Sequence, residues 1–102
     1  MVTHPRLLTL SPKERLVLEL LARHGDGYGL QLVTASRGRL KRGTVYVTLG
    51  RMEEKGYIRS RLDDPPEGAG GMPRRLYTPT ALGVRVLGAW TSGARRLVPE
   101  IA

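Results

Sequence analysis

Aliphatic residues recur at helical spacing near the beginning of the chain, directly after residues that are typical of a helix start. Ser11 and Glu14 are spaced as a capping box, and Pro12 stands at the first helical position, where its missing N–H is not needed. Four apolar residues then share one helical face: Leu16, Val17, Leu20 and Leu21. Gly25 provides a left-handed stop. The pattern predicts a helix over residues 12–24.

Two further helices are predicted before the middle of the chain. Asp26-Gly27 is typical of a turn, and residues 28–35 read as a short second helix. Residues 36–43 form a basic connector. A third helix is predicted over residues 44–55, and it ends at Gly56.

The third predicted helix has an apolar face and an unusual exposed face. The apolar face carries Val45, Leu49 and Met52. The other face carries Thr44, Val47, Thr48 and Arg51, where an ordinary surface helix would carry Glu–Lys pairs. Gly50 lies in the interior of this helix, where glycine costs about 1 kcal/mol relative to alanine. A close packing contact at Gly50 is the expected reason.

The second half of the chain predicts a β-hairpin and a last helix. Residues 57–62 and 74–78 alternate between apolar and polar side chains, as half-buried strands do. Residues 63–73 between them are rich in proline and glycine and predict a long loop. Thr80 can cap a helix over residues 81–98. Four of its residues form a stripe at coiled-coil spacing: Leu87, Trp90, Ala94 and Leu97.

This order of elements predicts a mainly α fold with a small β-hairpin, the winged helix-turn-helix. It has three helices, a two-stranded wing and a C-terminal helix, and its third helix is the one that reads a nucleic-acid groove. We expect residues 1–79 to form the winged, DNA-binding part. Residues 80–102 are expected to form a C-terminal dimerisation helix within the same compact unit.

The positive charge of the chain is concentrated in one region. The net charge is +8, and residues 37–61 contain eight basic and two acidic side chains, a net of +6. This region covers the connector, the third helix and the first wing strand. A basic surface favours a polyanionic partner, with nucleic acid as the first choice and an anionic membrane surface as the second. A solvated basic face without a partner is the alternative.

Several classes of function are disfavoured by what the sequence lacks. The chain has no cysteine, which excludes a disulfide scaffold, thiolate metal sites and cysteine catalysis. No nucleophile–base pair, phosphate-binding loop or metal-ligand constellation is present, so we expect no enzyme activity, metal or cofactor. No apolar run approaches the ~18–20 residues of a membrane span. We therefore expect a cytoplasmic protein without a membrane partner.

Residues 42–58 resemble the recognition-helix signature of PadR-family transcriptional regulators. In that signature a Gly-Thr-aliphatic-Tyr start leads to a Leu-x-Arg-hydrophobic-Glu-x-x-Gly end. Three further matches lie in the family's order: Tyr28-Gly29-Leu30, Pro73-Arg74-Arg75-Leu76-Tyr77 and Thr80-Ala81-Leu82-Gly83. The resemblance covers about residues 10–90. Val47 departs from the pattern, since many members carry proline there.

The resemblance implies a bacterial homodimer of the short branch of the family, which lacks a larger C-terminal domain. Such a protein is usually a repressor that binds a pseudo-palindromic operator in double-stranded DNA. The resemblance also implies release by a small-molecule effector that changes the geometry of the dimer.

Ten residues are the candidates for DNA contact: Lys41, Arg42, Thr44, Tyr46, Thr48, Arg51, Arg59, Arg61, Arg74 and Arg75. Arg42 is expected to contact phosphate, whereas Arg51 suits a base, a phosphate or a pairing with Glu54. Thr44 is either a contact residue or only an N-cap. Tyr46 matches the family tyrosine that is expected to touch the DNA backbone, and its alternative is a packed tyrosine with a satisfied hydroxyl. The wing tip is acidic, so the bases of the wing strands are expected to make the contacts.

Trp90 has two interpretations. It anchors the dimer together with Leu87, Ala94 and Leu97, or it stacks on a planar effector, as the family resemblance implies.

Two other classes of protein also remain open. One is a winged-helix module that binds a protein partner, and the other is a basic RNA-binding domain.

Overall fold

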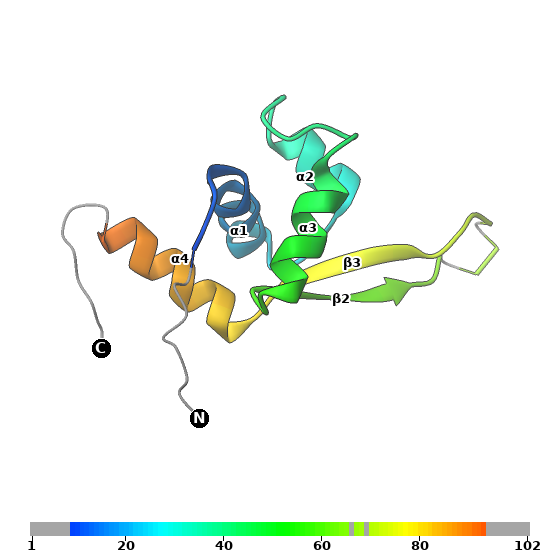
Figure 1. Ribbon diagram of the computed structural model, residues 1–102. Coiled ribbons are helices and arrows are strands. Elements are labelled where there is room, and N and C mark those ends of the chain that lie inside the picture. Colours follow the sequence, from blue (N-terminus) through cyan, green and yellow to red (C-terminus); the bar gives the residue numbers. More distant parts are fainter. Residues whose placement is uncertain (1–8, 66, 69, 94–102) are drawn as a thin grey trace.

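The computed structural model describes residues 9–65, 67–68 and 70–93 of the chain. Its elements are α1 (Pro12–His24), β1 (Gly27–Tyr28), α2 (Gly29–Ala35), α3 (Val45–Glu54), β2 (Ile58–Asp63), β3 (Arg74–Pro79) and α4 (Ala81–Gly93). Figure 1 shows the helices gathered on one side, with β2 and β3 extending away from them as a long hairpin. Three helices, a wing and a fourth helix form a winged helix-turn-helix, so the predicted fold class is confirmed.

The first helix begins and ends as its capping residues predict. The Glu14 N–H donates to Ser11 Oγ over 3.2 Å, and the Ser11 N–H donates to Glu14 Oε1 over 2.8 Å. Both bonds of the capping box are therefore present. Gly25 follows the helix with φ +88°, and its N–H donates to the Leu21 carbonyl oxygen over 2.6 Å. This positive φ explains why glycine ends the helix.

The core is mainly aliphatic and also contains two tyrosines, Tyr57 and Tyr77. Its residues come from every helix and from both long strands, and those buried most deeply include Val17, Leu18, Leu21, Leu40, Val45, Leu49, Met52, Tyr57 and Ile58. Val45, Leu49 and Met52 are the predicted apolar face of α3, which is confirmed. Because this face is buried, the opposite face of α3 is turned to solvent.

The sheet has one strand more than the predicted hairpin. Its order is β1-β3-β2, and all pairs are antiparallel. Gly27 pairs with Tyr77, and Tyr28 pairs with Leu76. The turn predicted at Asp26-Gly27 is therefore wrong at Gly27, and Tyr28 is a strand residue rather than the first residue of a helix. A strand of two residues has no periodicity that a sequence pattern could reveal.

Thr80 fixes the start of α4 and joins it to the turn between α3 and β2. Its Oγ1 accepts from the Gly83 N–H over 3.0 Å, as the capping prediction requires, and donates to the Gly56 carbonyl over 2.6 Å. Gly83 is buried where α4 crosses the Tyr57 backbone, and a Cβ at this position would overlap the Tyr57 carbonyl oxygen. The glycine therefore permits this close approach. The predicted continuation of α4 to residue 98, with Ala94 and Leu97, lies outside the described residues.

One prediction about α3 is wrong. A Cβ built at Gly50 would meet no atom of the described residues within 4 Å, so no close packing contact explains this glycine.

Among the helices that the structure describes, none is long and apolar enough to cross a membrane.

Candidate nucleic-acid interface

The exposed face of α3 joins polar, basic and apolar side chains. Tyr46 and Val47 are 50% and 57% exposed, and Arg51 is also exposed. Thr48 is partly exposed, and its hydroxyl lies 3.5 Å from the Thr44 carbonyl oxygen, to which it donates. The structure therefore places Tyr46, Val47, Thr48 and Arg51 on one solvent-facing surface of α3. We call these four residues, together with the exposed residues of the turn before α3, the α3 face.

The turn before α3 adds two cations to this face. Lys41 and Arg42 are both exposed, and the N–H groups of Thr44 and Val45 donate to the Lys41 carbonyl over 3.1 and 2.9 Å. Thr44 occupies the N-cap position, but within the described chain its side chain makes no capping hydrogen bond. Thr44 therefore stands at the N-cap position, but its hydroxyl is not used to cap α3.

Tyr46 combines exposure with packing. Its ring lies against the first residue of α2, because a Cβ at Gly29 would come within 2.6 Å of Tyr46 Cε1 and 2.7 Å of its hydroxyl oxygen. Only glycine leaves room for the ring in this position. One edge of Tyr46 is therefore held by α2 while half of the residue faces solvent, so the contact and packing interpretations each describe part of it.

A hydrogen-bonded chain connects the α3 face to the wing. Arg75 Nη1 donates to Ser60 Oγ over 3.0 Å, and Ser60 Oγ donates to Glu53 Oε2 over 2.8 Å. Glu53 is in α3, Ser60 in β2 and Arg75 in β3. The same region raises the pKa of Tyr77, mainly through burial of its hydroxyl; the charge of Arg75 opposes this rise, and that of Glu53 adds to it. Arg75 is therefore the predicted wing residue that the structure brings beside α3.

The other three wing arginines lie on the opposite face of the sheet. Arg59 pairs with Thr78, Arg61 with Leu76, and Arg74 with Asp63, whereas Ser60 pairs with Tyr77. Cross-strand partners share a face, and neighbouring residues alternate between faces. The structure therefore does not bring Arg59, Arg61 and Arg74 together with Arg75.

Arg74 is engaged within the sheet. Its guanidinium carbon lies 4.0 Å from the centre of the Tyr28 ring, a cation–π arrangement. The Tyr28 hydroxyl donates to the Asp63 carboxylate at the end of β2. This hydrogen bond is the main cause of a raised pKa of Tyr28, and the charge of Arg74 works against it. Arg74, Tyr28 and Asp63 thus join β1 to the base of the wing loop.

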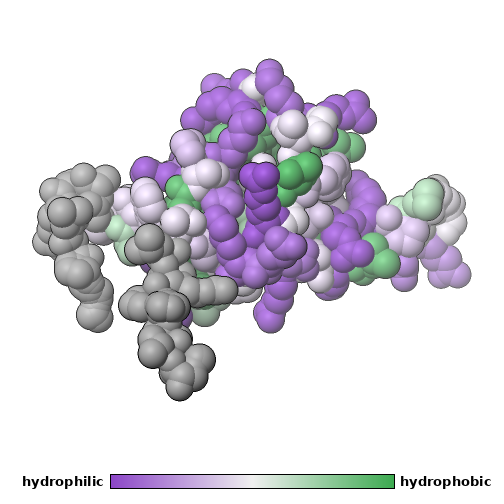
Figure 2. Space-filling model, viewed as in Figure 1, coloured by the Kyte–Doolittle hydropathy of each residue, from purple (hydrophilic) through white to green (hydrophobic). Residues whose placement is uncertain are grey.

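Figure 2 shows hydrophilic side chains over most of this side of the molecule, interrupted by small hydrophobic areas near α3 and on the wing. The exposed apolar residues of these regions are Tyr46, Val47, Leu62 and Met72. The sequence placed Val47 on the exposed face of α3 without assigning it a contact, and Leu62 was not among the predicted site residues. Among the described residues, no group of three His, Asp or Glu side chains could hold a metal ion.

A comparison with protein families decides the identity. The model of the transcriptional regulator PadR-like family matches residues 17–89, which include most of α1, the α3 face, the wing and most of α4. The chain belongs to the PadR-like family. Members of this family are regulators of transcription and not enzymes.

Solved structures agree with this assignment. A PadR family transcription regulator from Clostridium difficile is 31% identical, with a TM-score of 0.70 over 83% of this chain and 88% of that one. A PadR family regulator from Eggerthella lenta is 29% identical, with a TM-score of 0.64 over 80% and 73% of the two chains. Bacillus subtilis PadR, solved in complex with operator DNA, is 21% identical, with a TM-score of 0.69 over 86% of this chain and 51% of that one. No curated protein matches the chain significantly.

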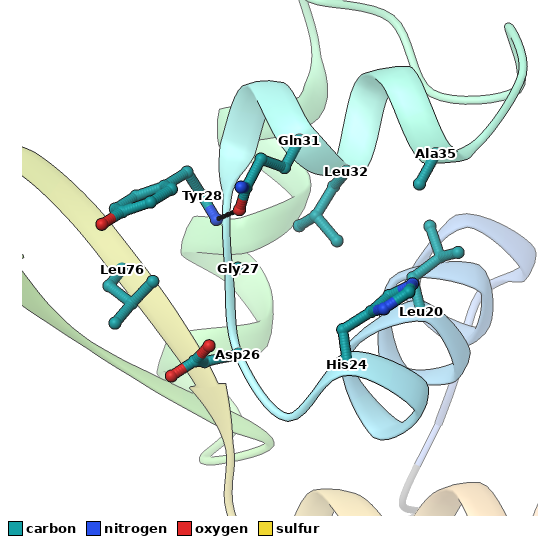
Figure 3. A pocket seen from close by; sticks show the side chains of 9 residues that line it. All are labelled: Leu20, His24, Asp26, Gly27, Tyr28, Gln31, Leu32, Ala35 and Leu76. Carbon is teal, nitrogen blue, oxygen red and sulfur yellow. Dashed lines mark hydrogen bonds between the residues drawn. The ribbon is translucent and has the colours of Figure 1, made fainter.

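The PadR-like chain also has a groove between α1 and α2 that the sequence did not indicate. It has a volume of about 440 Å³ and an apolar floor of Leu20, Leu32 and Leu76. Figure 3 shows His24, Asp26, Tyr28 and Gln31 around this floor. The Tyr28 N–H donates to Gln31 Oε1 over 2.9 Å, which holds the start of α2.

Two of the residues predicted to form a dimer are described, and they differ in their surroundings. Leu87 is partly buried and packs against the core of its own chain. Trp90 is 42% exposed and lines a second groove of about 410 Å³ at the beginning of α1, together with Leu10, Pro12, Arg15, Leu16, Glu19 and Arg39. In this PadR-like protein, Trp90 therefore lies beside a groove and not within the core.

Proposed function

We propose that this PadR-like regulator is a sequence-specific repressor that binds a pseudo-palindromic operator as a homodimer. The observation that carries the proposal is the α3 face, which combines the exposed cations Lys41, Arg42 and Arg51 with hydroxyl and apolar side chains that reach solvent. Such a surface suits a helix that lies in the major groove of double-stranded DNA. A regulator that acts on a bacterial operator works in the cytoplasm.

The residues of the α3 face would share the work of binding. Lys41 and Arg42 precede the helix and suit phosphate contacts, which release counterions and position the protein. Arg51 is one turn beyond Val47 on the same face and suits a guanine edge or a further phosphate. Arg75 reaches the same side of the molecule through its bond to Ser60, so a wing contact with the flanking backbone completes the interface.

The remaining wing arginines are proposed to have roles other than contact beside α3. Arg59 and Arg61 are exposed on the far face of the sheet, where they suit the flanking minor groove if the hairpin lies along it. Arg74 is held over the Tyr28 ring and is proposed to position the wing as well as to carry charge.

The homodimer is proposed to form through residues 80–102, with residues 1–79 as the DNA-binding part. Support comes from the end of α4, where Trp90 is 42% exposed although it is apolar. A two-fold dimer would place its recognition helices about 34 Å apart, one turn of DNA. An effector that stacks on Trp90 would release the repressor by favouring a dimer with another separation.

The proposal is tested by fluorescence anisotropy with a duplex from the protein's own upstream region, a scrambled duplex and a salt series. Specific binding predicts an affinity at least ~10³-fold higher for the native duplex, with a steep loss as salt rises. Arg42→Ala and Arg51→Ala should both weaken binding, and only Arg51→Ala should change which sequences bind if that arginine reads a base. Arg23→Ala, in the last turn of α1, is the matched control.

The other outcomes identify the alternatives. Equal affinity for both duplexes would indicate an architectural protein, and equal affinity for single-stranded RNA would indicate an RNA-binding domain. If the protein binds no duplex at low salt, binding of a protein partner becomes the leading function. The single tryptophan allows a separate test of the effector, because a planar aromatic dye that stacks on Trp90 would quench its fluorescence in the absence of DNA.

A further inference from the structure

Val47 is the apolar residue of α3 that the fold does not use. It is 57% exposed, whereas Val45, Leu49 and Met52 of the same helix are buried. A β-branched residue at an exposed helical position also has a lower helix propensity than alanine. Neither the core nor the helix therefore explains a valine at this position.

The surroundings of Val47 leave its side chain accessible. Residues three and four positions away on a helix are its neighbours on the surface, and here these are Thr44, Gly50 and Arg51, with Gly43 just before the helix. A Cβ at Gly43 or Gly50 would meet no described atom within 4 Å. Because Gly43 and Gly50 have no side chains, a partner can approach the backbone of α3 closely beside Val47.

The charge around Val47 indicates what this partner is. Lys41, Arg42 and Arg51 are exposed at the two ends of the same surface, and they favour a polyanion over an apolar protein surface. In the major groove of DNA, the group that an aliphatic side chain can contact is the 5-methyl group of thymine. Cations at the edges and a methyl-bearing side chain at the centre fit one ligand, a thymine-containing step of the operator.

We propose that Val47 reads the 5-methyl group of a thymine, and that Gly50 allows the DNA to approach α3 closely enough for this contact. The inference rests on the proposed function and adds the base type that the centre of the α3 face selects. It also gives a role to Val47, the position at which many members of the family carry proline.

The test uses the full chain and its operator duplex with each thymine of one half-site replaced in turn by deoxyuridine, which lacks only the methyl group. One buried methyl group corresponds to about a fourfold change in affinity. The wild-type protein should therefore lose about fourfold at one or two positions. Val47→Ala should bind the thymine duplex more weakly and should no longer distinguish thymine from deoxyuridine at those positions.

The outcomes separate this inference from the proposed function. Tight, specific binding that tolerates deoxyuridine at every position would overturn the inference and leave the function intact. Discrimination that persists in Val47→Ala would assign the methyl contact to another residue and would also overturn it. A protein that binds no duplex specifically would overturn both.

Gly50→Ala supplies a second test with two readouts of opposite sign. The added methyl group has open space, so alanine should raise the melting temperature because it is the better helix former. The same methyl group should lower the affinity for the operator, because it stands where the DNA approaches. Thr34→Ala in α2 is the control, since Thr34 is exposed, lies outside the α3 face and α4, and is a poorer helix former than alanine. It should raise stability and leave operator affinity unchanged, and a Gly50→Ala protein that behaves like this control would overturn the role of Gly50.

Discussion

At the scale of single residues, Gly29 and Tyr46 show how a packing contact sets the position of a side chain that is proposed to bind DNA. The Tyr46 ring rests on the α2 backbone at Gly29, while half of the residue remains exposed. The tyrosine that is proposed to contact DNA is thus oriented by a residue in another helix. A change at Gly29 should therefore act on binding through Tyr46.

Gly29→Ala should move the Tyr46 ring away from its present position and weaken operator binding. The new methyl group would lie 2.6 Å from Tyr46 Cε1, but the ring is the free end of a side chain and can swing outward. We expect little change in melting temperature and an up to about tenfold loss of affinity, the value of one hydrogen bond. Gly27→Ala is the control, since its Cβ would make ordinary contacts of 3.5 Å and longer. Equal affinities of the Gly29→Ala and wild-type proteins would show that the ring position does not matter for binding.

Tyr28 offers a prediction about pH. Its pKa is raised above the ordinary 10.0, chiefly because its hydroxyl donates to Asp63. A raised pKa in the folded state means that the stabilisation is fully present below about pH 10 and is lost as the pH rises through the folded pKa. Tyr28→Phe should therefore melt below the wild type at pH 8, and the difference should shrink above pH 10. A difference that is constant up to pH 11 would contradict this role of the hydroxyl.

At the scale of elements, an ion pair holds the end of α3 to the beginning of α1. Lys55 Nζ lies 2.9 Å from both Glu14 carboxylate oxygens, and it also donates to the Thr9 carbonyl and hydroxyl oxygens over 3.4 and 3.3 Å. The Glu14 side chain is 4% exposed, and that of Lys55 is 34% exposed. The carboxylate is thus almost fully removed from water, and this lysine is the cation paired with it.

Lys55→Met should destabilise the protein more than the loss of an ordinary surface pair. An uncompensated buried carboxylate costs several kcal/mol, and the partial exposure of Lys55 reduces the expected loss to about 1–3 kcal/mol. Arg15→Met is the matched control, because Arg15 and Glu19 form an ion pair in which both side chains are more than a third exposed. Its loss should cost less than about 1 kcal/mol in urea unfolding. Similar losses for the two variants would show that burial of Glu14 adds nothing to the pair.

The elements that the sequence predicted well are those with a local signal. The capping box of α1 and the apolar spacing of α3 depend on neighbouring residues, and both are confirmed. Strand β1 could not be predicted, because two residues carry no period and its partner is far along the chain. Alternation within a strand places Arg74 and Arg75 on opposite faces in any register. Which of the two shares a face with Ser60 could not be predicted, since a shift of one residue in strand register exchanges the two faces.

At the scale of the whole molecule, charge and apolar surface are divided between two regions. The cations of the α3 face and Arg75 lie on one side, and the exposed Trp90 lies on α4, which packs along α1 on the side away from the wing (Figure 1). The first region suits a polyanion and the second an apolar partner. A dimer through α4 would therefore leave both α3 faces open, which is the arrangement that an operator with two half-sites needs.

Trp90→Ala should weaken the dimer without unfolding the chain, because Trp90 is 42% exposed and borders a groove rather than filling the core. Sedimentation velocity should show a shift toward monomer, and operator affinity should fall because the second half-site no longer contributes. Binding to a duplex with a single half-site should not change, which separates a dimer defect from damage to α3. Val84→Ala, at an exposed position on another side of α4, is the control and should sediment like the wild type. A Trp90→Ala protein that remains dimeric would assign the tryptophan to ligand binding, and loss of fluorescence quenching by a planar dye would then be its expected defect.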